Sequence, residues 1–434
     1  MDSTVRRVPA AAFLAPAPLR QLRSTVGPTG AAASQWLCPS PAAVCPVVAP
    51  RPAAAAAAPH RGGVRMNAVA DGARRGLDTA TDAAVGGGGD GASRGGGGGG
   101  GGGGRGGGGA AGGIRRFALI SDVHIFDTEG FWYERALDFT NRRVFGLLNI
   151  LMLRGPDKFS RHVLASSMAD MRANAVDHLV IAGDVTNLAI ECEFALSKEY
   201  FSRFGPPANI TAVPGNHDVY TGKELKRRLF AKYFGEYAQS DVPVASARDD
   251  GFPFLQLRGG VAFLGLNTGI PGSARGLVGP AQFDAARKML TSPEGKALLA
   301  RAKTLIMVLH HPTQDPRMRG LPRVRDIGHD LIDWEDVAAF CREFPIAMTL
   351  HGHNHVPYQG RLTLAPDTFV YESGSGTLLA DNPSRIARYT VFELDDAGQL
   401  VRTFARVWDP ETAKFMSLEL RLPTMADVGV VAQV

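Results

Sequence analysis

The sequence contains few cysteines and no long hydrophobic run. Its four cysteines are scattered along the chain, at Cys38, Cys45, Cys192 and Cys341. This number and spacing argue against a disulfide framework and a zinc finger, and favour a reducing compartment or indifference to redox state. The best apolar run, Leu147–Leu153, contains Asn149 and is far shorter than the roughly 18 residues of a membrane-spanning helix. The sequence therefore predicts neither a disulfide scaffold nor a membrane-spanning protein.

An evenly spread positive charge is absent as well. The chain carries 47 Lys and Arg against 42 Asp and Glu, and its pI is near 9.1. Residues 1–113 hold eleven Arg, no Lys and five Asp, a net charge of +6, whereas the rest carries 36 basic and 37 acidic residues. Because the remaining part is nearly neutral, its charge gives no support to a nucleic-acid partner.

The first part of the chain has the composition of a targeting segment followed by a linker. Residues 1–66 are rich in Ala, Pro, Arg and Ser, with Asp2 as their only acid. This composition is typical of an organellar transit peptide, which we expect to be disordered, and predicts a plastid location, with mitochondrion or cytoplasm as alternatives. Residues 67–113 are dominated by glycine in their second half and predict a flexible linker, because such a segment has nothing to bury.

From residue 114 onward, strand-like and helix-like segments alternate. Apolar runs predict strands at 117–121, 178–182, 210–213, 255–257, 261–266, 304–309 and 346–350. Longer segments predict helices at 137–153, 161–174, 191–204, 280–301 and 333–342. Four more strand-like runs follow between residues 369 and 420. This order predicts a layered α/β fold with mixed sheets.

Polar clusters that could bind a metal follow five of the predicted strands. They are Asp122-x-His124, Gly183-Asp184, Gly215-Asn216-His217-Asp218, His310-His311-Pro312 and His351-Gly352-His353-x-His355. Together they contain seven of the eleven histidines of the chain. Each cluster alone has an ordinary explanation as a cap or a turn. Because reacting groups gather beyond the carboxyl ends of strands in α/β sheets, their repetition at five strand ends predicts one shared site.

In their order and local sequence, these motifs closely resemble the calcineurin-like metallophosphoesterase family, from residue 114 to about residue 420. The resemblance implies a four-layer sandwich of two mixed β-sheets flanked by helices, in a domain spanning 114–424 that is preceded by the disordered tail. It also implies a centre of two divalent or trivalent metal ions. The first metal would be held by Asp122, His124 and His355, the second by Asn216, His310 and His353, and Asp184 would bridge the two. Imidazole and carboxylate ligands suit Mn, Fe or Zn, and the lack of thiolates disfavours a structural zinc site.

The resemblance further implies that the protein hydrolyses a phosphodiester or phosphomonoester of a small molecule. Two metal ions would lower the pKa of a bridging water, and the resulting hydroxide would attack phosphorus. His217 lies next to Asn216 but outside the implied ligand set, and would protonate the leaving group as a general acid. His311 could be a neighbour of the site or a substrate contact.

The motifs are nearest to members resembling class III cyclic-nucleotide phosphodiesterases, and disfavour the protein phosphatases. The alternatives are a non-catalytic metal-binding scaffold on the same fold, a nuclease, or a hydrolase of phospholipid headgroups. Which phosphate ester is the substrate stays open, because one fold serves many chemistries.

A helical insertion is expected at about 131–160, between the first two motifs. Within it an apolar stripe is formed by Val144, Leu147, Leu148 and Leu151. Such a stripe is typical of a helix packed on its own domain, which we favour, or of a lid or membrane-surface helix. Peripheral membrane contact is therefore open but not favoured, and the sequence does not indicate an oligomeric state.

Overall fold

The computed structural model describes residues 113–127, 158–219, 227–243, 250–314, 328–380, 382–428 and 432–433. The predicted transit peptide, nearly all of the predicted linker, and residues 131–157 of the expected insertion lie outside these residues. Within the described part of the chain, none of the helices has the length and hydrophobicity that a membrane crossing requires.

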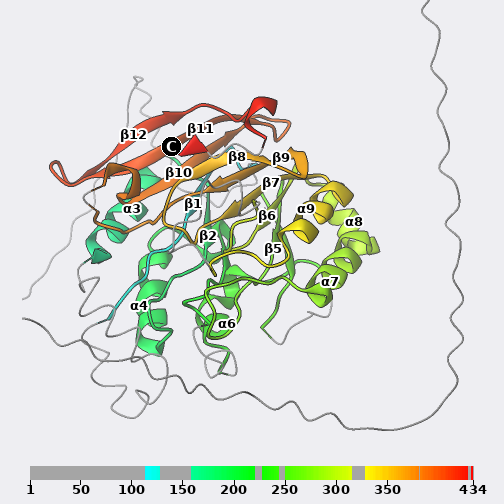
Figure 1. Cartoon of the computed structure of the whole chain (residues 1–434), viewed down its shortest axis with the longest axis horizontal. Coiled ribbons are helices and arrows are strands. Elements are labelled where there is room, and N and C mark those ends of the chain that lie inside the picture. The colour runs from blue at the N-terminus through cyan, green and yellow to red at the C-terminus, as the bar shows by residue number, and fades with distance from the viewer. Residues whose placement is uncertain are drawn as a thin grey trace, which may run out of the picture. The chain divides into compact units, whose positions relative to one another are not determined.

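The first of two mixed β-sheets carries the N-terminal motifs (Figure 1). Its strands are β1 (Arg116–Ile120), β2 (His178–Ala182), β3 (Ile210–Val213), β10 (Arg388–Leu394), β11 (Leu400–Asp409) and β12 (Lys414–Leu420). They are arranged in the order β12–β11–β10–β1–β2–β3. Strands β1, β2 and β3 are parallel, whereas β10, β11 and β12 are each antiparallel to a neighbour. The residues of β2 and β3 are all buried, as expected for parallel strands covered on both faces.

The second sheet carries the C-terminal motifs. Its strands are β4 (Phe254–Arg258), β5 (Val261–Gly265), β6 (Thr304–Val308), β7 (Ile346–His351), β8 (Tyr358–Leu362), β9 (Ala365–Glu372) and β13 (Ala432–Gln433). They lie in the order β13–β8–β9–β7–β6–β5–β4. Strands β5, β6, β7 and β9 are parallel, and β4, β8 and β13 are antiparallel to their neighbours.

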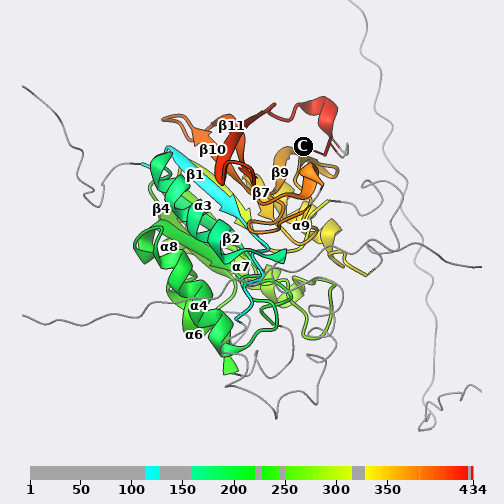
Figure 2. The same ribbon diagram turned by 90° about the vertical axis from the view of Figure 1, so that its left-hand side faces the viewer.

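Helices flank the two sheets on opposite sides. The α-helices of the described residues are α3 (Arg161–Ala173), α4 (Glu191–Ser202), α6 (Leu229–Phe234), α7 (Pro280–Thr291), α8 (Pro293–Leu299) and α9 (Trp334–Glu343). Short 3-10 turns lie at η4 (Pro207–Asn209), η5 (Gly235–Tyr237), η7 (Pro383–Arg385) and η8 (Met425–Asp427). Helices α3 and α4 lie beside the first sheet and α7, α8 and α9 beside the second (Figure 1), and Figure 2 views the fold from the side of α3 and α4.

The main core fills the space between the sheets. Phe117 of β1 packs edge-on against Phe263 of β5, with 6.2 Å between the ring centroids, so the two sheets meet through these rings. Along β6 the side chains alternate: Ile306 belongs to this central cluster, whereas Met307 belongs to a second cluster with α7 and α9. The fold is therefore the four-layer α/β sandwich that the sequence motifs imply.

The structure confirms the seven strands predicted before residue 351 and the four strand-like runs after it, but it corrects one helix. The helix expected at 280–301 is interrupted at Ser292, which has an extended backbone and separates α7 from α8. Pro293 cannot donate the hydrogen bond that would continue α7, and the Ser292 hydroxyl accepts from Gly295 N as the cap of α8. The short elements α6, β8 and β13 were not predicted.

Candidate metal centre

The predicted ligands lie in the loops that follow five parallel strands. In each loop the first predicted ligand lies two or three residues after the last residue of the strand. These last residues are Ile120 of β1, Ala182 of β2, Val213 of β3, Val308 of β6 and His351 of β7. Hydrogen bonds join neighbouring loops directly: Asp122 N donates to Gly183 O at 3.1 Å, and Gly352 N donates to His310 O at 3.1 Å. The structure brings all seven predicted ligands together, because parallel strands present their carboxyl ends at the same edge.

The backbone of these loops is unusual at the predicted ligands themselves. Positive φ angles occur at five of them: Asp122 (54°), His124 (42°), Asp184 (52°), His353 (85°) and His355 (57°). Residues with a Cβ rarely adopt this left-handed conformation, which costs on the order of 1–3 kcal/mol when it is imposed by the surroundings. The loops are therefore held in a conformation that serves the position of these side chains.

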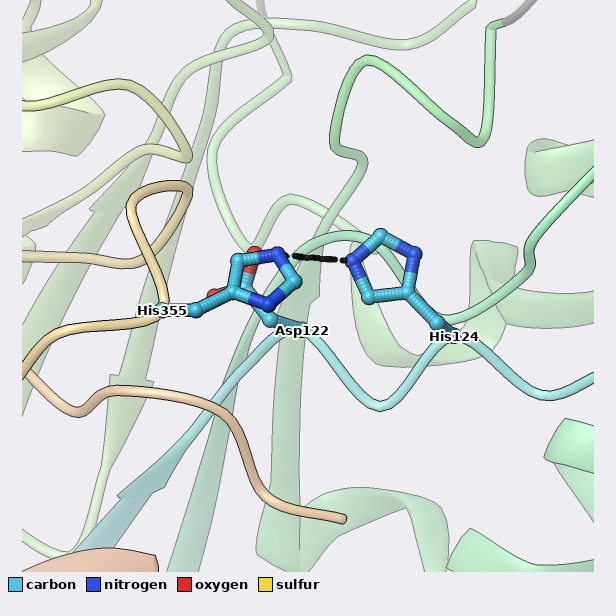
Figure 3. Close-up of side chains that lie close together, drawn as sticks. All are labelled: Asp122, His124 and His355. Atoms are coloured by element: carbon cyan, nitrogen blue, oxygen red, sulfur yellow. Dashed lines mark hydrogen bonds and ion pairs between the residues drawn. The ribbon is translucent and has the colours of Figure 1, made fainter. Parts of the chain in front are cut away.

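Asp122, His124 and His355 form the first group of converging side chains (Figure 3). The Nε2 atoms of His124 and His355 lie 3.0 Å apart, and His355 Nε2 is 3.5 Å from Asp122 Oδ1. Asp122 and His124 are fully buried, whereas the side chain of His355 is 15% exposed. Two imidazole nitrogens and a carboxylate oxygen thus face one another.

The second group consists of Asn216, His310 and His353. Asn216 Oδ1 lies 3.1 Å from His310 Nε2 and 3.0 Å from His353 Nδ1. The last two nitrogens are 3.3 Å apart. All three residues are buried.

Asp184 lies between the two groups. One of its oxygens, Oδ2, is 3.6 Å from His124 Nε2 of the first group and 3.4 Å from His310 Nε2 of the second. Its other oxygen, Oδ1, accepts a hydrogen bond from His217 N at 2.8 Å. A single buried carboxylate therefore joins both groups.

The hydrogen bonds of His310 test whether these residues fit a metal ion. Its Nδ1 is 2.7 Å from the carbonyl oxygen of Ala182, and a carbonyl can only accept, so Nδ1 carries a hydrogen. In a neutral ring, the lone pair of Nε2 then faces the oxygens of Asp184 and Asn216, which are acceptors too. Such a convergence of acceptors needs an added proton or a cation, and an imidazole oriented by a backbone carbonyl is typical of metal ligands. The residues fit a bound metal.

The pKa shifts of Asp122, Asp184 and His310 also favour a bound cation. Burial raises the pKa of the Asp122 carboxyl to about 7, although the His310 imidazole opposes the shift. Burial would also raise the pKa of Asp184, but the imidazoles of His310 and His217 hold it well below its usual range. Burial would lower the pKa of His310, yet the Asp184 carboxylate outweighs it and raises the pKa to about 10. Buried carboxylates here depend on positive charge nearby.

Two glycines of the motifs are required because other loops approach them closely. A Cβ atom at Gly215 would lie 2.1 Å from Asp184 Oδ1, and one at Gly352 would lie 2.4 Å from Asp122 Oδ2. Any side chain at either position would displace a predicted ligand. The glycines of the motifs thus serve the close contact between loops.

His217, the predicted general acid, lies beside the first group. Its ring is 4.6 Å from that of His124, in an edge-on arrangement. Its Nδ1 is 2.7 Å from the carbonyl oxygen of Asn187, so Nδ1 carries a hydrogen, and any proton that the ring exchanges is carried by the opposite nitrogen, Nε2. His124, Asp184 and His217 also form a third set of potential metal-binding groups.

His311, left open by the sequence, is fully buried and engaged in hydrogen bonds. Its Nδ1 lies 2.7 Å from the Thr268 hydroxyl and its Nε2 lies 3.2 Å from the carbonyl oxygen of Ala274. Its ring lies against that of His353, at 4.4 Å between centroids. These contacts make it a support of the second group rather than a substrate contact.

Three other residues at the site, Glu372, Phe159 and His329, were not predicted from the sequence, and Asp218 was named there only as part of a motif. Glu372 accepts from Asn354 N at 2.9 Å and holds the turn between His353 and His355. Asp218 accepts four hydrogen bonds, of which three come from the loop after β2 and join it to the loop after β3. Glu372 closes an apolar strand and Asp218 belongs to a recognised motif, so the sequence contained a signal for both. No motif marks the remaining two, Phe159, whose ring lies 4.8 Å from that of His124, and His329, 5.4 Å from that of His353.

The layered sandwich and the convergent carboxylates and imidazoles define a metallohydrolase-like architecture. The chain belongs to the calcineurin-like phosphoesterase family, whose sequence model matches residues 115–357, and is a hydrolase of phosphoric esters. The family that the motifs resemble is thereby confirmed. A search of curated proteins finds no match to the sequence.

Solved structures with a similar arrangement include several phosphatases. A dimetal phosphatase from Danio rerio is 11% identical, with 71% of this chain and 99% of that chain covered and a TM-score of 0.41. A purple acid phosphatase from yellow lupin (Lupinus luteus) seeds is 11% identical, with 73% and 55% covered and a TM-score of 0.42. A 5′-nucleotidase from Candida albicans is 13% identical, with 70% and 53% covered and a TM-score of 0.38. The aligned region spans about half the length of the last two proteins.

Proposed function

We propose that this phosphoesterase uses a dinuclear metal centre to hydrolyse a phosphodiester or phosphomonoester of a small molecule. The first metal would be bound by Asp122, His124 and His355, the second by Asn216, His310 and His353, and both by Asp184. The observation that carries the proposal is the position of Asp184 Oδ2, which lies within 3.6 Å of an imidazole from each group. A carboxylate between two ligand sets is suited to bridge two ions.

When bound, two such ions would supply a nucleophile near neutral pH by lowering the pKa of an attacking water, and would neutralise charge on the phosphoryl oxygens. Mn, Fe and Zn suit this ligand set, in which nitrogen and oxygen donors are mixed and the described part of the site contributes no thiolate. A nitrogen of each group lies within 3.6 Å of the same oxygen, Asp184 Oδ2, so ions held by the two groups would together orient a phosphoryl group.

His217 would protonate the leaving oxygen as the general acid. The Asn187 carbonyl fixes the hydrogen on Nδ1, and the backbone N–H of His217 is held by Asp184 Oδ1. Both contacts keep the ring beside the first group, so that the doubly protonated ring would give its Nε2 hydrogen to the leaving oxygen and become neutral with its remaining hydrogen on Nδ1. Since an alkoxide leaves slowly without a proton, this group contributes most for esters with poor leaving groups, typically about 10²–10⁴-fold.

The proposed substrate is small because the near-neutral charge of residues 114–434 provides no general attraction for a nucleic-acid backbone. The motif pattern favours members related to class III cyclic-nucleotide phosphodiesterases, and membrane contact is not favoured.

We propose a plastid location on the composition of residues 1–66, testable by imaging the full chain and a chain lacking residues 1–66 as fluorescent fusions. An unchanged distribution after the deletion would contradict it.

The decisive experiment is metal analysis of the purified full chain combined with a substrate panel in Mn²⁺. The panel includes cyclic nucleotides, glycerophosphodiesters, nucleotide pyrophosphates, and the p-nitrophenyl esters bis(p-nitrophenyl) phosphate and p-nitrophenyl phosphate. We expect about two metal ions per chain and metal-stimulated hydrolysis of at least one class. Less than one ion per chain, with no hydrolysis of any ester, would instead support the non-catalytic scaffold.

A further inference from the structure

Glu193 is a buried carboxylate close to the site but outside the proposed ligand set. It is the third residue of α4 and is fully inaccessible to solvent. One of its oxygens, Oε2, accepts backbone hydrogen bonds from the preceding loop: from Asn187 N at 3.2 Å, Leu188 N at 2.8 Å and Ile190 N at 3.4 Å. A buried carboxylate that accepts three N–H groups holds its loop firmly, because each bond is charge-assisted.

The loop needs such a clamp. Ala189, which lies between the clamped residues, has a φ of 54°, in the left-handed region that residues with a Cβ rarely adopt. The bond to Ile190 N is the ordinary contact between the third residue of a helix and its cap. The bonds to Asn187 and Leu188 reach further back and are not needed to cap the helix.

One peptide group connects Glu193 to His217. The carbonyl of Asn187 and the N–H of Leu188 belong to the same planar unit. The carbonyl side lies 2.7 Å from His217 Nδ1, and the N–H side donates to Glu193 at 2.8 Å. A rotation of this peptide plane would therefore break both hydrogen bonds together. The charge of Glu193 also polarises the peptide, which strengthens the carbonyl as an acceptor.

We propose that Glu193 is a positioning residue for His217: through the Asn187–Leu188 peptide it fixes the orientation of the imidazole and places the hydrogen on Nδ1. The inference rests on the proposed role of His217 as general acid. Without the clamp, the peptide can turn, and the ring can adopt the other tautomer or rotate away from the leaving group. Metal binding is not expected to depend on Glu193, since the hydrogen bonds described for its carboxylate come from the backbone of residues 187–190 and not from a proposed ligand.

The test compares Glu193→Ala and Glu193→Gln in the full chain. With Mn²⁺, Glu193→Ala should lower kcat for an alkyl phosphate ester by about tenfold or more, as is usual for groups that orient a functional imidazole. Hydrolysis of the corresponding p-nitrophenyl ester should change little, because its leaving group needs no proton. Glu193→Gln should be intermediate, since its amide oxygen can still accept from Leu188 N. Metal content should stay at the level of the parent protein.

A second readout does not depend on catalysis. Long-range ¹H–¹⁵N correlation spectra of the metal-free protein report which nitrogen of His217 carries the hydrogen. We expect the Nδ1–H tautomer in the parent protein and a mixture, or the other tautomer, in Glu193→Ala. Asp427→Asn is the matched control, because Asp427 is also a buried carboxylate that accepts a backbone N–H, from Thr424, but in η8. It should change neither the tautomer nor the ratio of the two esters.

Two results would overturn the proposal: an equal loss for both esters in Glu193→Ala, as expected of a purely structural cap, or an unchanged tautomer of His217. The role of His217 itself is tested separately. If His217→Ala hydrolysed the alkyl ester at the parental rate, the general-acid assignment would fail. A changed tautomer in Glu193→Ala would still support the positioning contact in that case.

Discussion

Two buried histidines at opposite ends of the parallel strands behave in opposite ways. His310 lies at the site, where the Asp184 carboxylate outweighs the effect of burial and raises its pKa to about 10. His178, at the start of β2, stacks on Phe263 at 4.9 Å between ring centroids, and burial lowers its pKa to about 3. Both are buried in the same sandwich. The difference shows that burial favours a neutral imidazole, and that a convergent carboxylate outweighs burial and favours the charged form at the candidate metal site.

The neighbours of His178 explain its neutral state. Its Nε2 lies 2.8 Å from the Thr211 hydroxyl, which in turn donates to Gln256 Oε1. The hydroxyl therefore accepts a hydrogen from His178, and the nearby Arg258 guanidinium further disfavours a positive charge on the ring. The polar side chains around His178 form hydrogen bonds with one another in the core. At the carboxyl ends of the strands, by contrast, hydrogen-bond acceptors converge on one another.

Removing Asp184, the carboxylate beside His310 that His178 lacks, should have the largest effect on metal content and activity. Asp184→Asn removes the carboxylate whose Oδ2 lies near an imidazole nitrogen of each ligand group, so we expect loss of both metal ions and of all metal-dependent hydrolysis. Metal analysis and activity in Mn²⁺ check this. Retention of about two ions per chain would show that Asp184 does not bridge them.

Substituting each of the two histidines in turn tests directly whether His310, and not His178, binds a metal ion. His310→Gln should lose the second metal and most activity, because it removes a buried nitrogen ligand. His178→Gln is the matched control, since glutamine can still donate to Thr211, and it should keep both metals and the parental kcat. Equal metal content in the two variants would contradict the assignment of His310.

His217→Ala should have a smaller and more selective effect. The variant is expected to keep its metals, because His217 is not one of the seven proposed ligands. Its turnover of alkyl esters should fall by about 10²–10⁴-fold, with a much smaller loss for p-nitrophenyl esters. A loss of metal instead would assign His217 to the third potential ligand set that it forms with His124 and Asp184.

The smallest effect concerns the pH dependence of stability. The pKa of His178 is about 3 in the folded protein and about 6.5 when unfolded, so below pH 6.5 the unfolded state binds the extra proton. Its contribution is fully favourable above pH 6.5 and is lost as the pH falls toward 3. Between pH 7 and pH 5 it should lower the free energy of unfolding by about 2 kcal/mol.

Denaturant unfolding of the parent chain and of His178→Gln at both pH values measures this contribution. The variant should lose less stability than the parent between the two pH values, because glutamine does not titrate. If both proteins lost the same amount, His178 would not be the group responsible.

Most of the architecture could be predicted from local pattern. Buried strands such as β2 are uninterrupted apolar runs, and these are visible in any sequence. The break at Ser292 was missed because the apolar spacing continues across it, although Pro293 marks the start of a new helix. Helix α6 is too short to show a helical period. The roles of the ligands stay proposals. Their gathering beyond the ends of parallel strands could be predicted from the sequence, but their meeting also depends on the packing of the two sheets from which they come.

The contact of Glu193 with the Asn187–Leu188 peptide could not be predicted in this way. A glutamate in the first turn of a helix reads as an ordinary cap. Only the fold brings the loop after β3 against the loop after β2, so that one peptide meets both Glu193 and His217. Hydrogen bonds between distant loops depend on backbone geometry that local pattern does not encode.

The family, the strand-end motifs and the residue types suited to a metal site can be recognised from the sequence. Which of these side chains face one another, and which of them are charged, depends on the tertiary structure. The physical reason is that the pKa of a buried group depends on the few ångströms around it. His178 and His310 have the same chemistry in the sequence, and their neighbours in the fold, above all Asp184 beside His310, make their pKa values different.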